Sequence, residues 1–123
     1  MDIQITTDKC LNILDEMKAK DTVVLDVQGK MDFCDRLIIS TANNPRHLFA
    51  IVNALIDAFT LIKRKAVHKD GDGQSGWMVT DFGDVVVHVF LEHVRHKYDL
   101  ESLWTTEYED LLKMLSKEAE GDV

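Results

Sequence analysis

Three histidines close together in the sequence are the side chains best suited by type and spacing to bind a metal ion. His93 and His96 are three residues apart on a predicted helical turn, and His88 lies on the strand before it. A zinc site needs three or four ligands in fixed geometry, and neither cysteine is near in sequence. We therefore expect no metal. His88 is predicted to pack or hydrogen-bond within a sheet, and His93 and His96 to belong to a solvated basic turn with Arg95 and Lys97.

Acidic residues could hold the two metal ions of a nucleotidyltransferase, but their spacing does not favour it. That chemistry uses two carboxylates around a triphosphate, usually Asp-x-Asp on a strand after a Gly-Ser turn. The segment Asp35-Arg36-Leu37 lacks the second carboxylate, and Asp81 and Asp84 flank a predicted hairpin turn. Asp70 and Asp72 lie in a glycine-rich segment without a Gly-Ser pair. We interpret these acids as turn formers and solvated surface. A nucleotidyltransferase-like enzyme stays open as an alternative.

Other catalytic and ligand-binding patterns are also incomplete. Asp70-Gly71-Asp72-Gly73 is similar to a calcium loop, but Ser75 stands at the position that requires glycine and Asp81 at the one that requires glutamate. The sequence has no phosphate-binding glycine loop, and Ser75 lacks the flanks of a hydrolase nucleophile. Cys10 lies on a predicted apolar helix stripe, and Cys34 precedes a strand. We expect no catalytic residue and no cofactor.

Length and charge bound the class of protein. The chain has 123 residues, which predicts one domain over residues 1–123 with a frayed acidic tail at 118–123. No apolar stretch could span a membrane, and the first residues are not a signal or transit peptide, so we expect a cytoplasmic protein with free thiols. A net charge of −8 argues against a phosphate-driven nucleic-acid binder and suits a basic protein partner.

Hydrophobic periodicity predicts an α/β domain with a mixed sheet and helices packed on it. A first helix is expected to begin at Thr6 or Thr7 and end near Lys20, followed by strands over residues 22–27 and 37–41. The second of these strands is apolar enough to be buried on both faces.

The second helix has the strongest signal. Asn44 is predicted to cap it, with Pro45 at the first helical position and a basic end at residues 63–65. Its predicted apolar stripe is Leu48, Ile51, Val52, Leu55, Ile56, Phe59 and Ile62.

The second half is predicted to be mainly β-structure. A short strand at residues 66–68 and a loop at 70–76 lead into strands at 77–80 and 85–90, joined by a turn at 81–84. A short helix at 92–96 follows, and a capping box formed by Thr106 and Glu109 predicts a last helix through about Lys117.

The segment after the short helix is not explained by core packing. Tyr98, Asp99 and Leu100 lie between predicted elements. Tyrosine and tryptophan beside an aliphatic residue are typical of protein-interface hot spots. We predict partial exposure for Trp77, which follows a glycine-rich loop, and a core position for Trp104.

Four segments resemble the Iojap / ribosomal silencing factor (RsfS) family. They are Cys34–Ala42, Asn44–His47, Gly83–Phe90 and Tyr98–Trp104, within a resemblance that runs from about Lys9 to Leu112. The resemblance implies a nucleotidyltransferase-like fold without the catalytic set. It also implies binding of the large ribosomal subunit through its ribosomal protein fourteen, which blocks joining of the small subunit and represses translation when nutrients are scarce.

On this resemblance, the docking face is expected to contain Trp77, Tyr98, Asp99, Leu100 and Ser102. Asp99 can pair with a lysine or arginine of the partner. Little direct contact with nucleic acid is expected. A homodimeric adaptor, in which this face pairs with itself, stays open as the other alternative, and a weak homodimer is compatible with either function.

Overall fold

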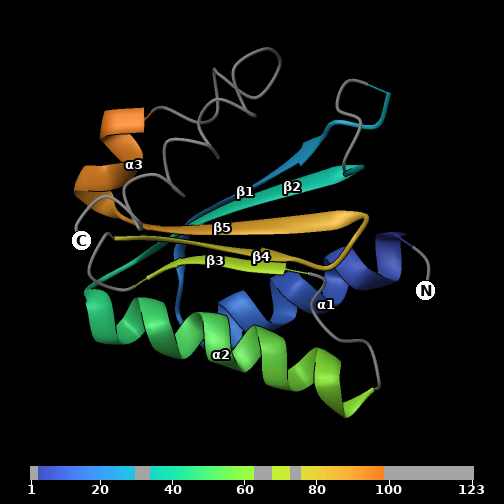
Figure 1. The fold of residues 1–123 in the computed structure, drawn as a ribbon, viewed down its shortest axis with the longest axis horizontal. Helices are drawn as coiled ribbons and strands as arrows, with labels where there is room; N and C mark the ends of the chain where they lie inside the picture. Colours follow the sequence, from blue (N-terminus) through green and yellow to red (C-terminus); the bar gives the residue numbers. More distant parts are fainter. Residues whose placement is uncertain (1–2, 30–33, 63–67, 73–75, 99–123) are drawn as a thin grey trace.

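A five-stranded mixed sheet with helices on both faces forms the framework of the chain (Figure 1). The computed structural model describes residues 3–29, 34–62, 68–72 and 76–98. The elements are α1 (Ile3–Glu16), β1 (Lys20–Asp26), β2 (Arg36–Ala42), α2 (Pro45–Leu61), β3 (His68–Asp72), β4 (Trp77–Asp81), β5 (Val85–Leu91) and α3 (Glu92–Tyr98). The strand order is β1-β2-β5-β4-β3, and β2 and β5 are parallel while the other neighbours are antiparallel. The predicted α/β class with a mixed sheet is confirmed.

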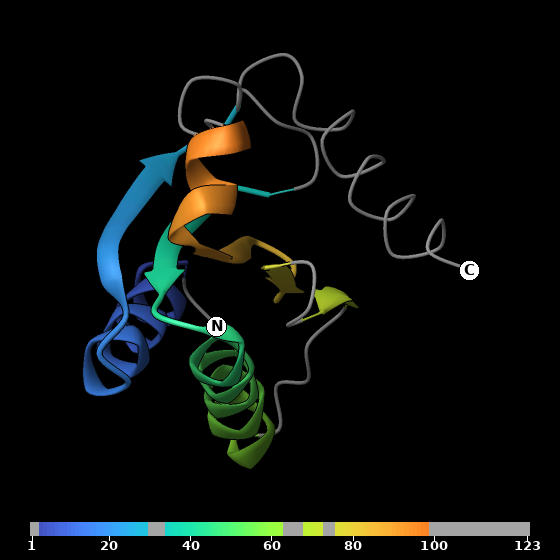
Figure 2. The ribbon, with the colours of Figure 1, turned by 90° about the vertical axis from the view of Figure 1, so that its left-hand side faces the viewer.

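Helices α1 and α2 cover one face of the sheet, and α3 lies on the other (Figure 2). Because side chains alternate along a strand, each buried strand contributes to two apolar clusters. The cluster under α1 and α2 includes Ile38, Val87 and Val89, and the opposite cluster includes Ile39 and Phe90. Strand β2 is buried on both faces, as predicted.

Helix α2 begins as predicted. Asn44 has an extended backbone (φ −161°, ψ 170°), and its side-chain oxygen accepts a hydrogen bond from the His47 backbone N–H at 2.8 Å. This bond satisfies one of the donors that a helix start leaves without a partner. The buried stripe is Leu48, Ile51, Val52, Leu55 and Phe59. Ile56 is half-buried, but Ile62 is 43% exposed because the helix ends at Leu61, so its place in the stripe was predicted wrongly.

The predicted start of the first helix is wrong. Helix α1 begins at Ile3, so Thr6 and Thr7 lie inside it and are buried. The Thr7 hydroxyl donates to the Ile3 carbonyl oxygen at 2.8 Å, a bond within the helix. The helix also ends earlier than predicted, at Glu16, and Lys18 then adopts a positive φ of 61°.

The predicted loop at residues 70–76 is also partly wrong, because Asp70, Gly71 and Asp72 belong to β3. Backbone pairing with β4 places Gly71 opposite Met78. Gly71 has a φ of +83°, and a Cβ there would collide with the Trp77 carbonyl oxygen. Gly71, which predicted a loop from the sequence, therefore lies in a strand, where the absence of a side chain lets the β3 and β4 backbones approach closely.

The strand predicted at residues 22–27 corresponds to β1. The strand predicted at 66–68 overlaps β3 only at His68, and residues 66–67 lie outside the described residues. The hairpin of β4 and β5 and the short helix α3 are confirmed. The basic segment 63–65, the last helix at 106–117 and the tail at 118–123 lie outside the described residues. No helix in the described part of the chain is long and apolar enough to cross a membrane.

Candidate functional site

Trp77 is a core residue, contrary to the predicted partial exposure. Its side chain is only 1% exposed and stacks on Phe90, with ring centroids 4.9 Å apart. The indole points into the second apolar cluster because β4 pairs Trp77 directly with Phe90. A side chain buried in this way has almost no area to offer a partner, so the predicted exposure is wrong, and a docking role for Trp77 stays a prediction that its burial does not support.

His88 holds the polar end of this indole. The Trp77 Nε1–H donates to His88 Nδ1 at 2.8 Å, inside the sheet. Burial lowers the pKa of His88 from 6.5 to about 3, because an imidazolium would lose its hydration there. The neutral ring thus accepts the tryptophan N–H. The prediction that His88 packs or hydrogen-bonds on the sheet is confirmed.

The other two histidines lie on the surface of α3. His93 and His96 are exposed, and His96 Nε2 is 3.9 Å from a carboxylate oxygen of Glu92 one turn earlier. The predicted solvated turn is confirmed for both histidines. Within residues 3–29, 34–62, 68–72 and 76–98, no group of three or more His, Cys, Asp and Glu is placed to hold a metal ion.

Three of the acids considered for metal catalysis, Asp35, Asp81 and Asp84, lie where the β4–β5 turn meets the start of β2. Asp81 forms the β4–β5 turn, since its carboxylate accepts the Gly83 backbone N–H at 2.7 Å, as predicted. The Asp84 carbonyl accepts backbone N–H groups of Asp35 and Arg36 at 2.8 and 3.1 Å, which attaches β2 to the same turn. Asp81 therefore has the turn-forming role predicted for it, and the Asp84 contacts come from its backbone.

Both cysteines are buried free thiols. Burial, with the nearby charges of Asp81 and Asp35, raises the pKa of Cys34 from 9.0 to about 12. A thiol with so high a pKa stays protonated at neutral pH and is a poor nucleophile. Cys10 lies on the buried face of α1, as its place on the apolar stripe predicted.

His47 has a structural role at the start of α2. Its Nδ1 accepts the Asn43 backbone N–H at 3.0 Å, and its Nε2 donates to the Met17 carbonyl oxygen at 2.6 Å. The ring therefore connects the end of α1 to the start of α2. No local sequence pattern indicates this link, because residues 17 and 47 meet only in the folded chain.

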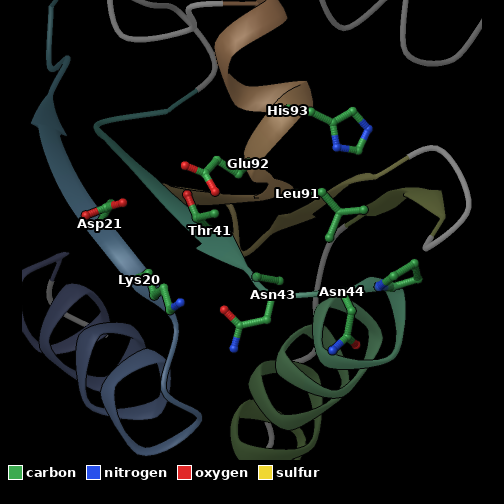
Figure 3. A pocket seen from close by; sticks show the side chains of 10 residues that line it. Lys20, Asp21, Thr41, Asn43, Asn44, Leu91, Glu92 and His93 are labelled. Carbon is green, nitrogen blue, oxygen red and sulfur yellow. The ribbon is translucent and has the colours of Figure 1, made fainter.

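A cleft of about 560 Å³ opens at the carboxyl ends of β2 and β5 (Figure 3). The chain leaves these parallel strands toward opposite faces, to α2 and to α3, and α/β proteins often bind ligands at such a point. Lys20 and Asp21 of β1, Asn44 before α2 and Glu92 of α3 surround it (Figure 3). The cleft thus combines one cation, two carboxylates and amide groups. Its lining comes from three distant segments, which explains why no sequence motif indicated it.

Arg95 of α3 makes tertiary hydrogen bonds that its sequence context does not indicate. It was assigned to a solvated turn, but its Nη1 donates to the Asp21 carbonyl oxygen at 2.6 Å and to the Thr41 Oγ1 at 2.8 Å. The guanidinium therefore ties α3 to β1 and β2. No motif marks it, since its acceptors lie 74 and 54 positions away in the chain.

The predicted docking residues lie at and beyond the end of α3. Tyr98 is the last residue of that helix. Asp99, Leu100 and Ser102 lie outside the described residues, as does Trp104. Their role in docking stays a prediction, while Trp77 is buried in the core.

The amino-acid sequence is similar to those of known ribosomal silencing factors. The profile of the family "Ribosomal silencing factor during starvation" (RsfS) matches residues 2–122. A "Ribosomal silencing factor RsfS" of Chromobacterium violaceum is 33% identical over 104 residues, covering 85% of each chain. The mouse protein "Mitochondrial assembly of ribosomal large subunit protein 1" is 30% identical over 115 residues, which cover 90% of this chain but 50% of the mouse protein.

The fold agrees with this relationship. A crystal structure of a protein from Chromobacterium violaceum superposes with a TM-score of 0.80 at 33% identity, covering 85% of this chain and 87% of the other. A structure from Bacillus halodurans gives a TM-score of 0.75 at 32% identity, covering 82% and 94%. The chain therefore belongs to the ribosomal silencing factor (RsfS) family.

Proposed function

We propose that this protein binds the large ribosomal subunit and prevents the small subunit from joining it, which represses translation when nutrients are scarce. The contact is made with ribosomal protein fourteen of the large subunit. The observation that carries this proposal is the family match over residues 2–122. The name of the mouse relative, which refers to assembly of the large subunit, supports the same partner. Repression by steric blocking requires only binding, so mass action is sufficient.

The docking segment in this proposal is residues 98–102, which begins at the last residue of α3. Tyr98 and Leu100 can bury apolar area against the partner, as hot-spot residues do. Asp99 can form a charge-assisted hydrogen bond with a lysine or arginine, and Ser102 can add a neutral one. Trp77 is left out, because its side chain is in the core.

Charge supports a basic protein as the direct partner. The chain has a net charge of −8, which speeds encounter with a basic surface and opposes binding to phosphates. We therefore propose little direct contact with ribosomal RNA. In this proposal residues 1–123 act as one domain, in the cytoplasm with the ribosomes.

A sucrose gradient with separated ribosomal subunits in magnesium tests the proposal. The double variant Tyr98→Ala, Asp99→Ala removes an aromatic and an acidic side chain from the docking segment. The matched control is Phe49→Ala, Asp57→Ala, which removes the same types from exposed positions of α2, on the other side of the sheet. We expect the unaltered protein and the control to travel with the large subunit and to suppress joined ribosomes. The docking variant should do neither.

Other outcomes would contradict the proposal in distinct ways. If the unaltered protein stays at the top of the gradient and subunit joining is unaffected, the ribosomal function is wrong. A dimer that persists on dilution would then favour the homodimeric adaptor, and magnesium-dependent nucleotide binding would favour an enzyme. If the docking variant and the control bind alike, the ribosomal function stands and the docking segment is wrong.

A further inference from the structure

Helix α3 depends on tertiary contacts for its position. It has seven residues, and isolated helices shorter than about 12–15 residues are marginal in water. Val94 packs in the apolar cluster on the second face of the sheet, and the Leu91 backbone N–H donates to the Gly76 carbonyl oxygen at 2.8 Å. A Cβ at Gly76 would lie 2.8 Å from Val94 Cγ2, so the helix packs directly against the backbone there.

These contacts hold α3 on the sheet, but they leave its direction weakly determined. Apolar packing is not directional, and Leu91 lies before the first residue of the helix. Arg95 supplies the direction, since its two hydrogen bonds end on β1 and on β2. Thr41, which accepts one of them, is 5% exposed and therefore cannot reach a partner protein.

The acceptor on β1 is placed by an unusual backbone. Asp21 has a φ of +51° at the irregularity between Lys20 and Val23, where the pairing register with β2 shifts. A residue other than glycine rarely has a positive φ, and such conformations persist where surrounding contacts hold them. Ser40 provides one such contact, because its Oγ donates to the Lys20 carbonyl oxygen at 3.2 Å. A bulge of this kind re-aims the groups beside it, and here the Asp21 carbonyl accepts from Arg95.

We propose that Arg95 is a positioning residue for partner binding. It fixes α3 against the bulge of β1 and the end of β2, and so sets the position at which the helix ends, at Tyr98, the first residue of the proposed docking segment. The binding part of this inference rests on the proposed function. A helix that is already fixed in place loses less conformational freedom when a partner binds at its end, so binding is tighter. Arg95 acts through α3 and needs no contact of its own with the partner.

Affinity for the large subunit is the first test, measured on the full chain. Arg95→Ala is expected to weaken binding about tenfold, which corresponds to about 1.4 kcal/mol. Thr41→Val removes one acceptor and should weaken binding by a smaller factor. The double variant should bind about as weakly as Arg95→Ala alone, because both changes break one linkage. The control Arg46→Ala removes the same charge from an exposed position of α2 and should bind normally.

Two substitutions of Asp21 separate the role of its backbone carbonyl from that of its carboxylate. Asp21→Gly removes the carboxylate but keeps the carbonyl and tolerates the positive φ. We expect it to bind normally. Asp21→Val disfavours the positive φ, because valine is β-branched, and should weaken binding. Equal loss in both variants would mean that the Asp21 carboxylate, and not its carbonyl, matters, which would overturn the role given to the bulge.

Hydrogen exchange of the α3 backbone amides is the second test, and it needs no ribosome. Arg95→Ala should exchange faster at residues 92–98 while α2 is unchanged. Unchanged exchange at α3 overturns the positioning role, whatever the affinity. Weaker binding with unchanged exchange would mean that Arg95 contacts the partner directly. If the unaltered protein does not bind the large subunit, the proposed function fails together with the docking role, and faster exchange would support only the anchoring of α3.

Discussion

Lowering the pH from 7 to 5 is expected to destabilise this protein by about 2 kcal/mol through His88 alone. Burial lowers the pKa of His88 to about 3 in the folded protein, against 6.5 for a free histidine. In this pH window the folded ring stays neutral while the unfolded chain takes up a proton. The contribution of His88 to the free energy of unfolding is therefore fully present above about pH 6.5, and it is lost progressively as the pH falls from about 6.5 to 3. The unfolded chain takes up this proton mainly below pH 6.5, so the loss accumulates over about 1.5 pH units. At about 1.4 kcal/mol per pH unit for one proton, the loss between pH 7 and 5 is about 2 kcal/mol.

Urea unfolding at pH 7, 6 and 5, followed by circular dichroism, measures this effect against a reference variant. His88→Asn keeps an oxygen that can accept the Trp77 N–H but has no group that titrates here. It should be less stable than the unaltered protein at pH 7, because a smaller side chain leaves a cavity. Other titrating groups are shared and cancel in the difference. The unaltered protein should lose about 2 kcal/mol more than the variant on acidification. Parallel losses would refute the assignment of a buried neutral imidazole.

Three further changes test other parts of the framework by thermal or urea unfolding. Asn44→Ala should destabilise by about 1 kcal/mol through loss of the α2 cap, and Asn44→Asp should not; equal losses would exclude a capping role. Gly71→Ala should destabilise the protein more than Gly29→Ala. Both glycines have a positive φ, but only at Gly71 would the new Cβ meet backbone atoms. Equal effects would contradict the close approach of β3 and β4 at Gly71. Thr80→Val should leave stability equal or raise it by up to about 1 kcal/mol, because the buried Thr80 hydroxyl has no hydrogen-bond partner in the described part of the chain; a clear loss would reveal one.

The elements that sequence analysis predicted well carry local signals. Asn44 and Pro45 mark the start of α2 by chemistry that acts within one turn. The apolar runs of β2 and β5 predict buried strands, because few other environments accept so many aliphatic residues. The errors lie where local signals mislead. Thr6 resembles a cap but is buried inside α1, and Gly71 resembles a loop residue but lies in β3.

The sequence by itself determined the α/β class, the mixed sheet, the start of α2 and the family, because these depend on periodicity, on capping and on motifs contiguous in the chain. Only the tertiary structure decided which side chains meet. It buried Trp77 against His88 and linked Arg95 to Thr41 and to the carbonyl of Asp21. Exposure and hydrogen-bond partners depend on the packing of distant segments, and no local pattern records that packing.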